Sequence, residues 1–360
     1  MKPYRLRLPG PTAVPERVRE AMARPMVSHR GAEFRDIFVG AAQMLQPIIG
    51  TPRHVFFFAS TGTGMMETAL VNTIAPGERV LVVIHGQFGE RFASIAEAMG
   101  AEVERLETEW GFSPDVSAIE ARLREREYRA VVAVHNESST GVAGPIPEIG
   151  ALLRERPELL LVDSVSGLGG MEMRMDEWGV DVLVSSSQKC LMCPPGVGIA
   201  AMSAKAWEIV RRDDRMPRYY LDLRRAMESA EKLETPFTTP VTLVAGLHEA
   251  LTMIHAEGLP QVLARHERLS KMLREGCAAL GMPSFARERL SNTVVALDVP
   301  GRGKEIVPAM YERHGSVIAG SRNHLSGRVI RIGTMGAITE EDIQTDLEHL
   351  ASCLANPASA

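Results

Sequence analysis

Two apolar segments of the sequence each end close to a residue that can take part in catalysis. Residues 159–162 are followed by Asp163, and a second apolar segment ends in small polar residues before Lys189. If both segments are strands of one parallel sheet, the carboxylate and the amine lie at the same edge, where α/β proteins form their ligand sites. The apolar, turn-rich residues 190–196 would desolvate the amine and favour its neutral, nucleophilic form.

Asp163 also has a purely structural interpretation. Its carboxylate could cap the turn formed by residues 164–167. A carboxylate at the end of a fully apolar strand must be paired or hydrogen-bonded, since burying it alone is costly. The nearby lysine favours the functional interpretation.

A third feature is the segment Ser60-Thr61-Gly62-Thr63-Gly64, which lies between an expected strand and an expected helix. Backbone N–H groups at a helix N-terminus bind anions. A dinucleotide site would need a third glycine where Glu67 stands, and an acidic residue after the next strand, where the sequence has Ile84-His85-Gly86. The segment therefore predicts a site for a single phosphate, with a capped structural helix as the alternative.

A phosphate site, a buried carboxylate and a buried lysine are the parts that pyridoxal 5'-phosphate requires. The lysine binds the aldehyde of this cofactor as an imine. The carboxylate keeps the pyridine nitrogen protonated, so that the ring can accept electrons from a substrate carbon. We therefore expect Lys189 and Asp163 to be the catalytic pair of an enzyme that uses this cofactor.

The segments that carry these residues alternate between short apolar runs and amphipathic helical patterns from residue 54 to about 202. This alternation is typical of β-α-β units, which build a mostly parallel sheet. We expect strands at 54–59, 79–84, 130–135, 159–163, 181–185 and 198–202, and helices at 64–74, 89–99, 115–127 and 146–155.

Beyond about residue 258 the pattern changes to one long helix followed by a smaller α+β unit. The sequence thus predicts an N-terminal arm (residues 1–20), a large domain (21–257) and a small C-terminal domain (258–360). In the small domain we expect strands at 293–299, 316–318 and 329–332, with helices at 304–314 and 340–351.

The composition restricts the possible partners. The chain has 360 residues, 45% of them hydrophobic, and a formal charge of −5. No basic excess favours nucleic acid or an anionic membrane, and the apolar runs are far shorter than the roughly 20 residues that cross a bilayer. The N-terminal residues show no apolar leader segment, so we expect a cytoplasmic protein.

Four cysteines fit a reducing compartment. Cys190 and Cys193 form one C-x-x-C pair. Because no second pair and no nearby histidine accompany them, we interpret them as buried thiols, with a zinc site as the alternative. We expect no metal.

Six motifs, spread in order over essentially the whole chain, resemble those of the class V aminotransferases of fold type I, in particular the alanine–glyoxylate and serine–glyoxylate (serine–pyruvate) group. The resemblance implies a large domain, with a mostly parallel seven-stranded sheet flanked by helices, and a small C-terminal α+β domain. The motifs are PGPTAVP from Pro9, STGTG from Ser60, HNESSTG from His135, LLLVDSVSGLGG from Leu159, SSSQKCLMCPPG from Ser185 and VIRIGT from Val329.

The resemblance also implies roles for individual residues. Lys189 would bind the cofactor and move the substrate proton, and Asp163 would pair with the pyridine nitrogen. Phe88 and Val165 would contact the two faces of the ring, and Ser138 would hydrogen-bond its phenolic oxygen. The cofactor phosphate would be held by Thr61, Gly62, Thr63 and Gln188.

Members of this group share active sites across a homodimer, which implies the same assembly here. Thr238 matches a threonine that the partner subunit donates to the phosphate, and Thr235 lies where some relatives place a tyrosine. His29 and Arg30 would either approach this site or lie on the solvated surface.

The activity that the resemblance implies is ping-pong transfer of an amino group from alanine or serine to glyoxylate or pyruvate. Arg331 would bind the substrate carboxylate, with Gly10 in the same pocket. The alternative is a 2-aminoethylphosphonate–pyruvate transaminase or another class V enzyme. A cysteine desulfurase is disfavoured because residues 316–331 contain no cysteine, and a non-catalytic binding protein is disfavoured because both Lys189 and Asp163 are present.

Overall fold

A computed structural model describes residues 4–212 and 215–355 and contains a large sheet of seven strands. Its strand order is β2-β10-β9-β8-β5-β3-β4, and neighbours are parallel except where β10 pairs with β2 and β9. The expected mostly parallel sheet is confirmed. Its strands are β2 (Val55–Ser60), β3 (Arg79–Ile84), β4 (Glu102–Glu107), β5 (Ala130–Val134), β8 (Leu159–Asp163), β9 (Val182–Ser186) and β10 (Gly196–Met202).

Helices cover both faces of this sheet, which explains why its central strands are continuous apolar runs. Along β3, Leu81 and Val83 pack into one apolar core, while Val80 and Val82 pack into the other. The first core includes α1 (Glu16–Met22), α2 (Ala32–Ile49), α5 (Val116–Glu125), α6 (Ile146–Leu153) and α9 (Val241–Glu257). The second includes α3 (Gly62–Thr73), α4 (Gln87–Ala98), α7 (Ala204–Arg212) and α8 (Leu223–Ala230).

Strand β4 is an edge strand that the sequence analysis did not predict. Its sequence EVERLE carries three glutamates, and its side chains are exposed or only partly buried. Charged side chains are common on edge strands, where they prevent pairing with other chains. An analysis based on apolar runs therefore overlooks such a strand.

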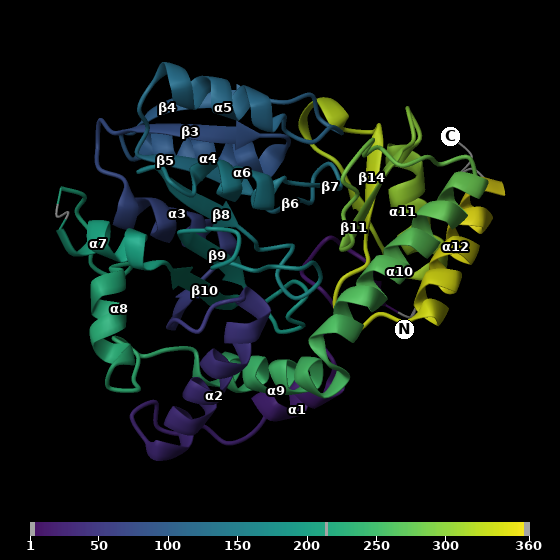
Figure 1. The fold of residues 1–360 in the computed structure, drawn as a ribbon. Helices are drawn as coiled ribbons and strands as arrows, with labels where there is room; N and C mark the ends of the chain where they lie inside the picture. The colour runs from purple at the N-terminus through teal and green to yellow at the C-terminus, as the bar shows by residue number, and fades with distance from the viewer. Residues whose placement is uncertain (1–3, 213–214, 356–360) are drawn as a thin grey trace.

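The C-terminal part has a sheet and an apolar core of its own, beside the large sheet (Figure 1). The sheet has the order β11-β14-β13, formed by β11 (Val294–Asp298), β14 (Val329–Gly333) and β13 (Ala319–Gly320). It packs with α10 (Leu259–Ala279), α11 (Gly303–His314) and α12 (Glu340–Ala355). The expected boundary at residues 20/21 falls inside α1, and the three predicted domain limits stay predictions.

The strand expected at 316–318 forms, but it pairs with a different partner. This strand, β12 (Ser316–Val317), is parallel to β1 (Arg5–Leu6) and lies outside the three-stranded sheet. The N-terminal segment is thus built into the C-terminal part, because Arg5 and Leu6 pair in register with Ser316 and Val317. A partner more than 300 residues away in sequence is not evident from local patterns.

A buried ion pair fixes this N-terminal segment. The Arg7 guanidinium contacts Asp346 Oδ2 at 2.5–2.6 Å, and the Asp346 side chain is fully buried. The backbone carbonyl of Arg7 also accepts a hydrogen bond from Gly333 N–H at 2.8 Å. Further along, Thr12 donates from its N–H to Gln188 O and from its hydroxyl to Lys189 O, both at 3.1 Å. The segment therefore links α12 and β14 to the loop that carries the lysine.

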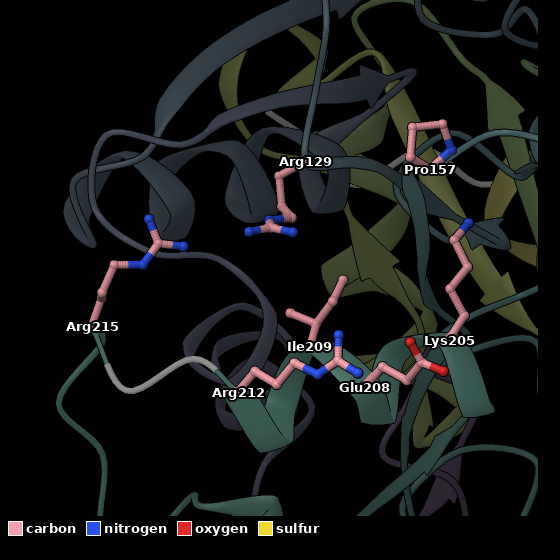
Figure 2. A pocket seen from close by; sticks show the side chains of 7 residues that line it. All are labelled: Arg129, Pro157, Lys205, Glu208, Ile209, Arg212 and Arg215. Atoms are coloured by element: carbon pink, nitrogen blue, oxygen red, sulfur yellow. The ribbon is translucent and has the colours of Figure 1, made fainter.

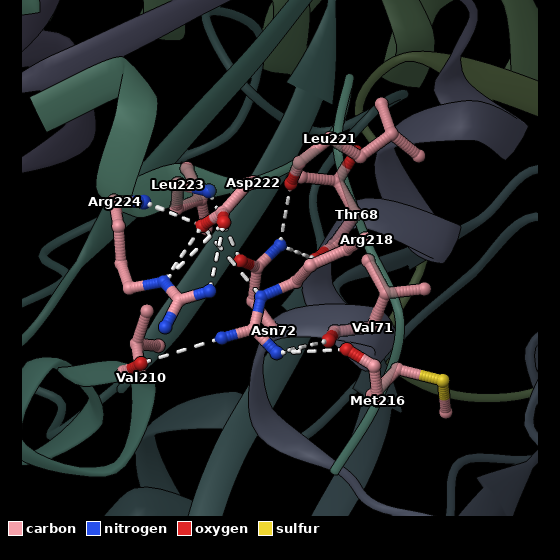
Figure 3. Close-up of polar contacts among 10 residues, drawn as sticks. All are labelled: Thr68, Val71, Asn72, Val210, Met216, Arg218, Leu221, Asp222, Leu223 and Arg224. Atoms are coloured by element: carbon pink, nitrogen blue, oxygen red, sulfur yellow. Dashed lines mark hydrogen bonds and ion pairs between the residues drawn. The ribbon is translucent and has the colours of Figure 1, made fainter. Parts of the chain in front are cut away.

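A second buried polar network holds α3 in place (Figure 3). Asn72 on α3 donates to Leu221 O at 2.7 Å and accepts from Leu223 N–H at 3.0 Å. Asp222 caps α8 by accepting from Arg224 N–H at 2.9 Å. The N–H groups at the start of a helix need partners from outside the helix, and Asn72 and Asp222 provide them for α8. The network thereby fixes the segment before α8 against α3.

We expect Asp346→Asn to lower the free energy of unfolding by about 3 kcal/mol, because it leaves the buried Arg7 guanidinium without its carboxylate. Thermal and urea unfolding at fixed protein concentration measure the change. The matched control is Arg124→Gln, which removes an exposed helical ion pair with Glu120 and should change the free energy by less than about 0.5 kcal/mol. Equal effects of the two substitutions would contradict the role given to the buried pair.

Candidate active site

Asp163 and Lys189 lie at the same edge of the sheet. Asp163 is the last residue of β8 and is paired in register with Val184 of β9, and Lys189 follows the end of β9. Desolvation raises the pKa of the Asp163 carboxyl to about 6, against the effect of the Val165 N–H that donates to Oδ1 at 2.8 Å. Desolvation also lowers the pKa of the Lys189 amine to about 8. The structure thus brings both groups to the carboxyl edge of the sheet, as the sequence predicted.

Backbone atoms of the N-terminal segment contact the lysine directly. Lys189 Nζ donates a hydrogen bond to the carbonyl of Pro9. Gly10 has a φ of +102°, and a Cβ at this residue would overlap Cδ, Cε and Nζ of Lys189. Only glycine allows this approach, because an L side chain would be both strained and in the way. The sequence-predicted Gly10 thus lies against the amine.

The segment expected to hold a phosphate forms the N-terminus of α3. Thr61 is the capping residue, and its hydroxyl accepts from Gly64 N–H at 3.2 Å. The Thr61 and Thr63 side chains are exposed, whereas a Cβ on Gly62 would lie 2.9 Å from Val165 Cγ2. The structure therefore brings Gly62 and Val165 together at the start of α3, where the first N–H groups of a helix have no intrahelical partner, as an anion site requires.

Arg331 connects the small sheet to this edge. From β14 it donates to Ser138 O at 3.2 Å and to Gly320 O at 2.8 Å. Its Nε is buried and has no hydrogen-bond partner among residues 4–212 and 215–355. Its charge also contributes to the lowered pKa of Lys189. A planar guanidinium with a free donor beside the amine is suited to bind a carboxylate.

Phe88 and Gln188 each contact a neighbouring side chain at the same edge. Phe88 lies on the first turn of α4, with the Arg91 guanidinium carbon 4.8 Å from its ring centroid. The Gln188 Oε1 atom accepts a hydrogen bond from the Ser186 hydroxyl. Both side chains are half-buried.

Comparison with known proteins identifies the family. The family model of class-V aminotransferases matches residues 10–345. The chain belongs to the class-V aminotransferases. It is therefore a transaminase of fold type I, and its cofactor is pyridoxal 5'-phosphate.

Several relatives of this aminotransferase have named activities. It is 37% identical to an L-aspartate–glyoxylate aminotransferase of Paracoccus denitrificans, covering 92% of this chain and 86% of the relative. It is 36% identical to a serine–glyoxylate aminotransferase of Hyphomicrobium methylovorum, covering 92% and 85%. The crystal structure of an alanine–glyoxylate aminotransferase from Nostoc sp. superposes with a TM-score of 0.94 at 30% identity, covering 99% of this chain and 96% of that one.

The residues at this edge fit the cofactor. A desolvated amine can react with an aldehyde, and Asp163 Oδ2 has no hydrogen-bond partner in the described part of the chain. The open N-terminus of α3 offers N–H groups to a phosphate. The unpartnered Nε of Arg331 leaves a donor for the substrate.

Glu137 is a buried residue of this site that the sequence analysis did not single out. It accepts hydrogen bonds from the N–H groups of Phe88 and Gly89 at 2.9 and 3.2 Å, and from the Ser139 hydroxyl at 2.6 Å. Its carboxylate thus caps α4 and fixes Phe88. Desolvation raises its pKa, and its charge helps to raise that of Asp163. The available signal was a carboxylate three residues after the buried strand β5, a pattern similar to the one that marked Asp163 at the end of β8.

Thr238 is not in contact with Lys189 in the described part of this chain. Its side chain is exposed, in a segment that lies beside residues 57–59 of β2 and Tyr220. Arg30 binds the start of this segment, by donating to Thr235 O at 2.6 Å and Glu234 at 3.0 Å. Arg30 is exposed in this chain, and whether it approaches the active site stays a prediction.

Two other features lie outside the catalytic edge. Cys190 and Cys193 are buried free thiols, and desolvation raises the pKa of each to about 12. A cavity of about 810 Å³ lies at the opposite edge of the sheet, where β5 and β8 begin (Figure 2). Several of its basic side chains are paired: Arg129 and Arg215 contact Glu78, and Lys205 contacts Asp181. It contains none of the predicted site residues.

We expect the apoenzyme to capture pyridoxal 5'-phosphate at a rate that rises about tenfold per pH unit up to pH 8 and then levels off. Only the neutral amine reacts, and its fraction rises with pH until the lowered pKa of about 8 is passed. Absorbance of the lysine-bound cofactor after rapid mixing measures the rate. The control in the same buffers is Nα-acetyl-lysine, whose side-chain amine is free. Its rate should rise up to about pH 10.5. A protein rate that still rises above pH 9 would contradict the lowered pKa.

Proposed function

We propose that this aminotransferase transfers the amino group of alanine or serine to glyoxylate or pyruvate. The observation that carries the proposal is Arg331, whose unpartnered Nε lies at the edge where Lys189 stands. A single carboxylate-binding arginine beside the reactive amine suits α-amino acids and 2-oxo acids alike. Glyoxylate appears in the names of the three relatives described above, which supports this acceptor.

In the proposed mechanism, Lys189 Nζ would take the proton from the substrate α-carbon and hold it for return. The cofactor supplies the conjugated ring that accepts the electrons of that carbon. Asp163 Oδ2 would accept a hydrogen bond from the protonated pyridine nitrogen, while Oδ1 accepts one from Val165 N–H. Because the pKa of Asp163 is about 6, this carboxyl is mostly ionised at neutral pH, and its charge would keep the proton on the ring nitrogen.

The remaining residues position the reactants in this proposal. Phe88 and Val165 would contact the two faces of the ring, and Ser138 would bind its phenolic oxygen. Gly10 would leave space for the substrate carboxylate beside Arg331. The phosphate would be held by Thr61, Gly62, Thr63 and Gln188.

We further propose that the aminotransferase is a homodimer in which Thr238 completes the partner subunit's phosphate site. Support comes from exposed apolar side chains near this segment: Tyr219 is 63% exposed and Leu233 is 48% exposed. A surface of this kind favours contact with another protein surface. We propose that the enzyme is cytoplasmic, because four free buried thiols suit a reducing compartment. No helix in the described residues is long and apolar enough to cross a membrane.

The amino donor is tested by the absorption spectrum of the purified enzyme, recorded with single donors. We expect alanine or serine to convert the lysine-bound cofactor to its pyridoxamine form, and glyoxylate to restore it, since the steps are reversible. Conversion by aspartate alone would assign the activity of the Paracoccus relative instead. Conversion by 2-aminoethylphosphonate alone would assign the phosphonate transaminase. A protein that does not bind the cofactor would contradict the whole proposal.

We expect Arg331→Gln to raise KM at least about tenfold for every donor and acceptor with an α-carboxylate, because a charge-assisted hydrogen bond is lost. Steady-state kinetics with alanine, serine, glyoxylate and pyruvate measure the effect. The control is Arg328→Gln, at the residue just before strand β14, where the arginine is paired with Asp298 at the surface. An effect on one substrate only would contradict a role for Arg331 in binding the shared carboxylate.

A further inference from the structure

Arg91 on α4 lies between two residues of the proposed cofactor site, yet no role has been given to it so far. Its NH1 donates to Thr63 Oγ1 at 3.1 Å, across from the N-terminus of α3. Its guanidinium carbon lies 4.8 Å from the centre of the Phe88 ring, a distance typical of a cation–π contact. One side chain thus contacts both the phosphate segment and the aromatic ring.

The charge of Arg91 has no carboxylate partner in residues 4–212 or 215–355, although its side chain is half-buried. The chain has more acidic than basic residues, and a comparable arginine, Arg105, is paired with Glu97 at 2.9 Å. A partly desolvated guanidinium is favourable when an anion is close. The contact with Thr63 indicates where that anion binds.

The field of Arg91 also reaches the reactive groups, since its charge lowers the pKa values of both Lys189 and Asp163. The guanidinium therefore lies within the electrostatic range of the cofactor. Its hydrogen bond, however, is to Thr63 at the open end of α3, which is the anion-binding end of that helix.

We propose that Arg91 binds the phosphate ester of pyridoxal 5'-phosphate together with the N-terminus of α3, and holds Phe88 in position through the same guanidinium. The planar fork of arginine suits two phosphate oxygens, and its face remains available to the ring. This assignment goes beyond the proposed amino donor and acceptor, because it depends only on the cofactor.

The proposal separates two ligands that differ only in the phosphate. We expect Arg91→Gln to raise the Kd of the apoenzyme for pyridoxal 5'-phosphate at least about tenfold, while the Kd for pyridoxal changes less than about twofold. Arg91→Lys keeps the charge and should recover most of the lost affinity. Titrations followed by absorbance and protein fluorescence give both constants without any measurement of turnover.

The control is Arg105→Gln, which removes an equal charge from the surface next to the same helix and should change neither Kd. Thermal unfolding of each apoprotein shows whether it is folded, and Arg91→Met provides a second variant if the glutamine protein is not. Equal weakening for both ligands would mean that Arg91 acts only through Phe88. An unchanged Kd for pyridoxal 5'-phosphate would show that Arg91 does not bind the phosphate. Either result would overturn the proposal.

Discussion

The chemistry of the site depends on the desolvation of one lysine and one aspartate at the carboxyl edge of a buried parallel sheet. Burial favours the neutral form of each group, so it lowers the pKa of Lys189 to about 8 and raises that of Asp163 to about 6. The apolar strands β8 and β9 provide this environment because helices cover them on both faces. The same packing that stabilises the sheet therefore prepares the two groups for proton transfer.

Segments from far along the chain converge on this edge. The N-terminal segment places Pro9 and Gly10 against the lysine, and β14 of the small sheet brings Arg331 to Ser138. Glu137 fixes the first turn of α4 through its hydrogen bonds. The site is thus assembled from the N-terminal segment, strand β14 and the first turn of α4. Buried polar contacts outside the reacting groups hold each of them in place.

The sequence was informative where burial produces a strong local pattern. Strands β3 and β8 have the predicted bounds because continuous apolar runs mark a strand that is covered on both faces. Strand β4 was missed because its charged residues face solvent at the edge. The pairing of β12 with β1 was missed because no local pattern specifies a partner from the other end of the chain. Glu137 was overlooked because its role, capping α4, depends on contacts that only the folded chain shows.

The contact between the first and last parts of the chain also affects the order of assembly during synthesis. Arg7 leaves the ribosome early, but Asp346, its buried partner, is 339 residues further along. Strand β1 likewise has no partner until β12 has been made. The large sheet can form before then, as domains generally fold from the N-terminus during translation. The backbone that surrounds Lys189 is therefore completed only when the chain is nearly finished, so nascent chains carry the lysine without its finished pocket.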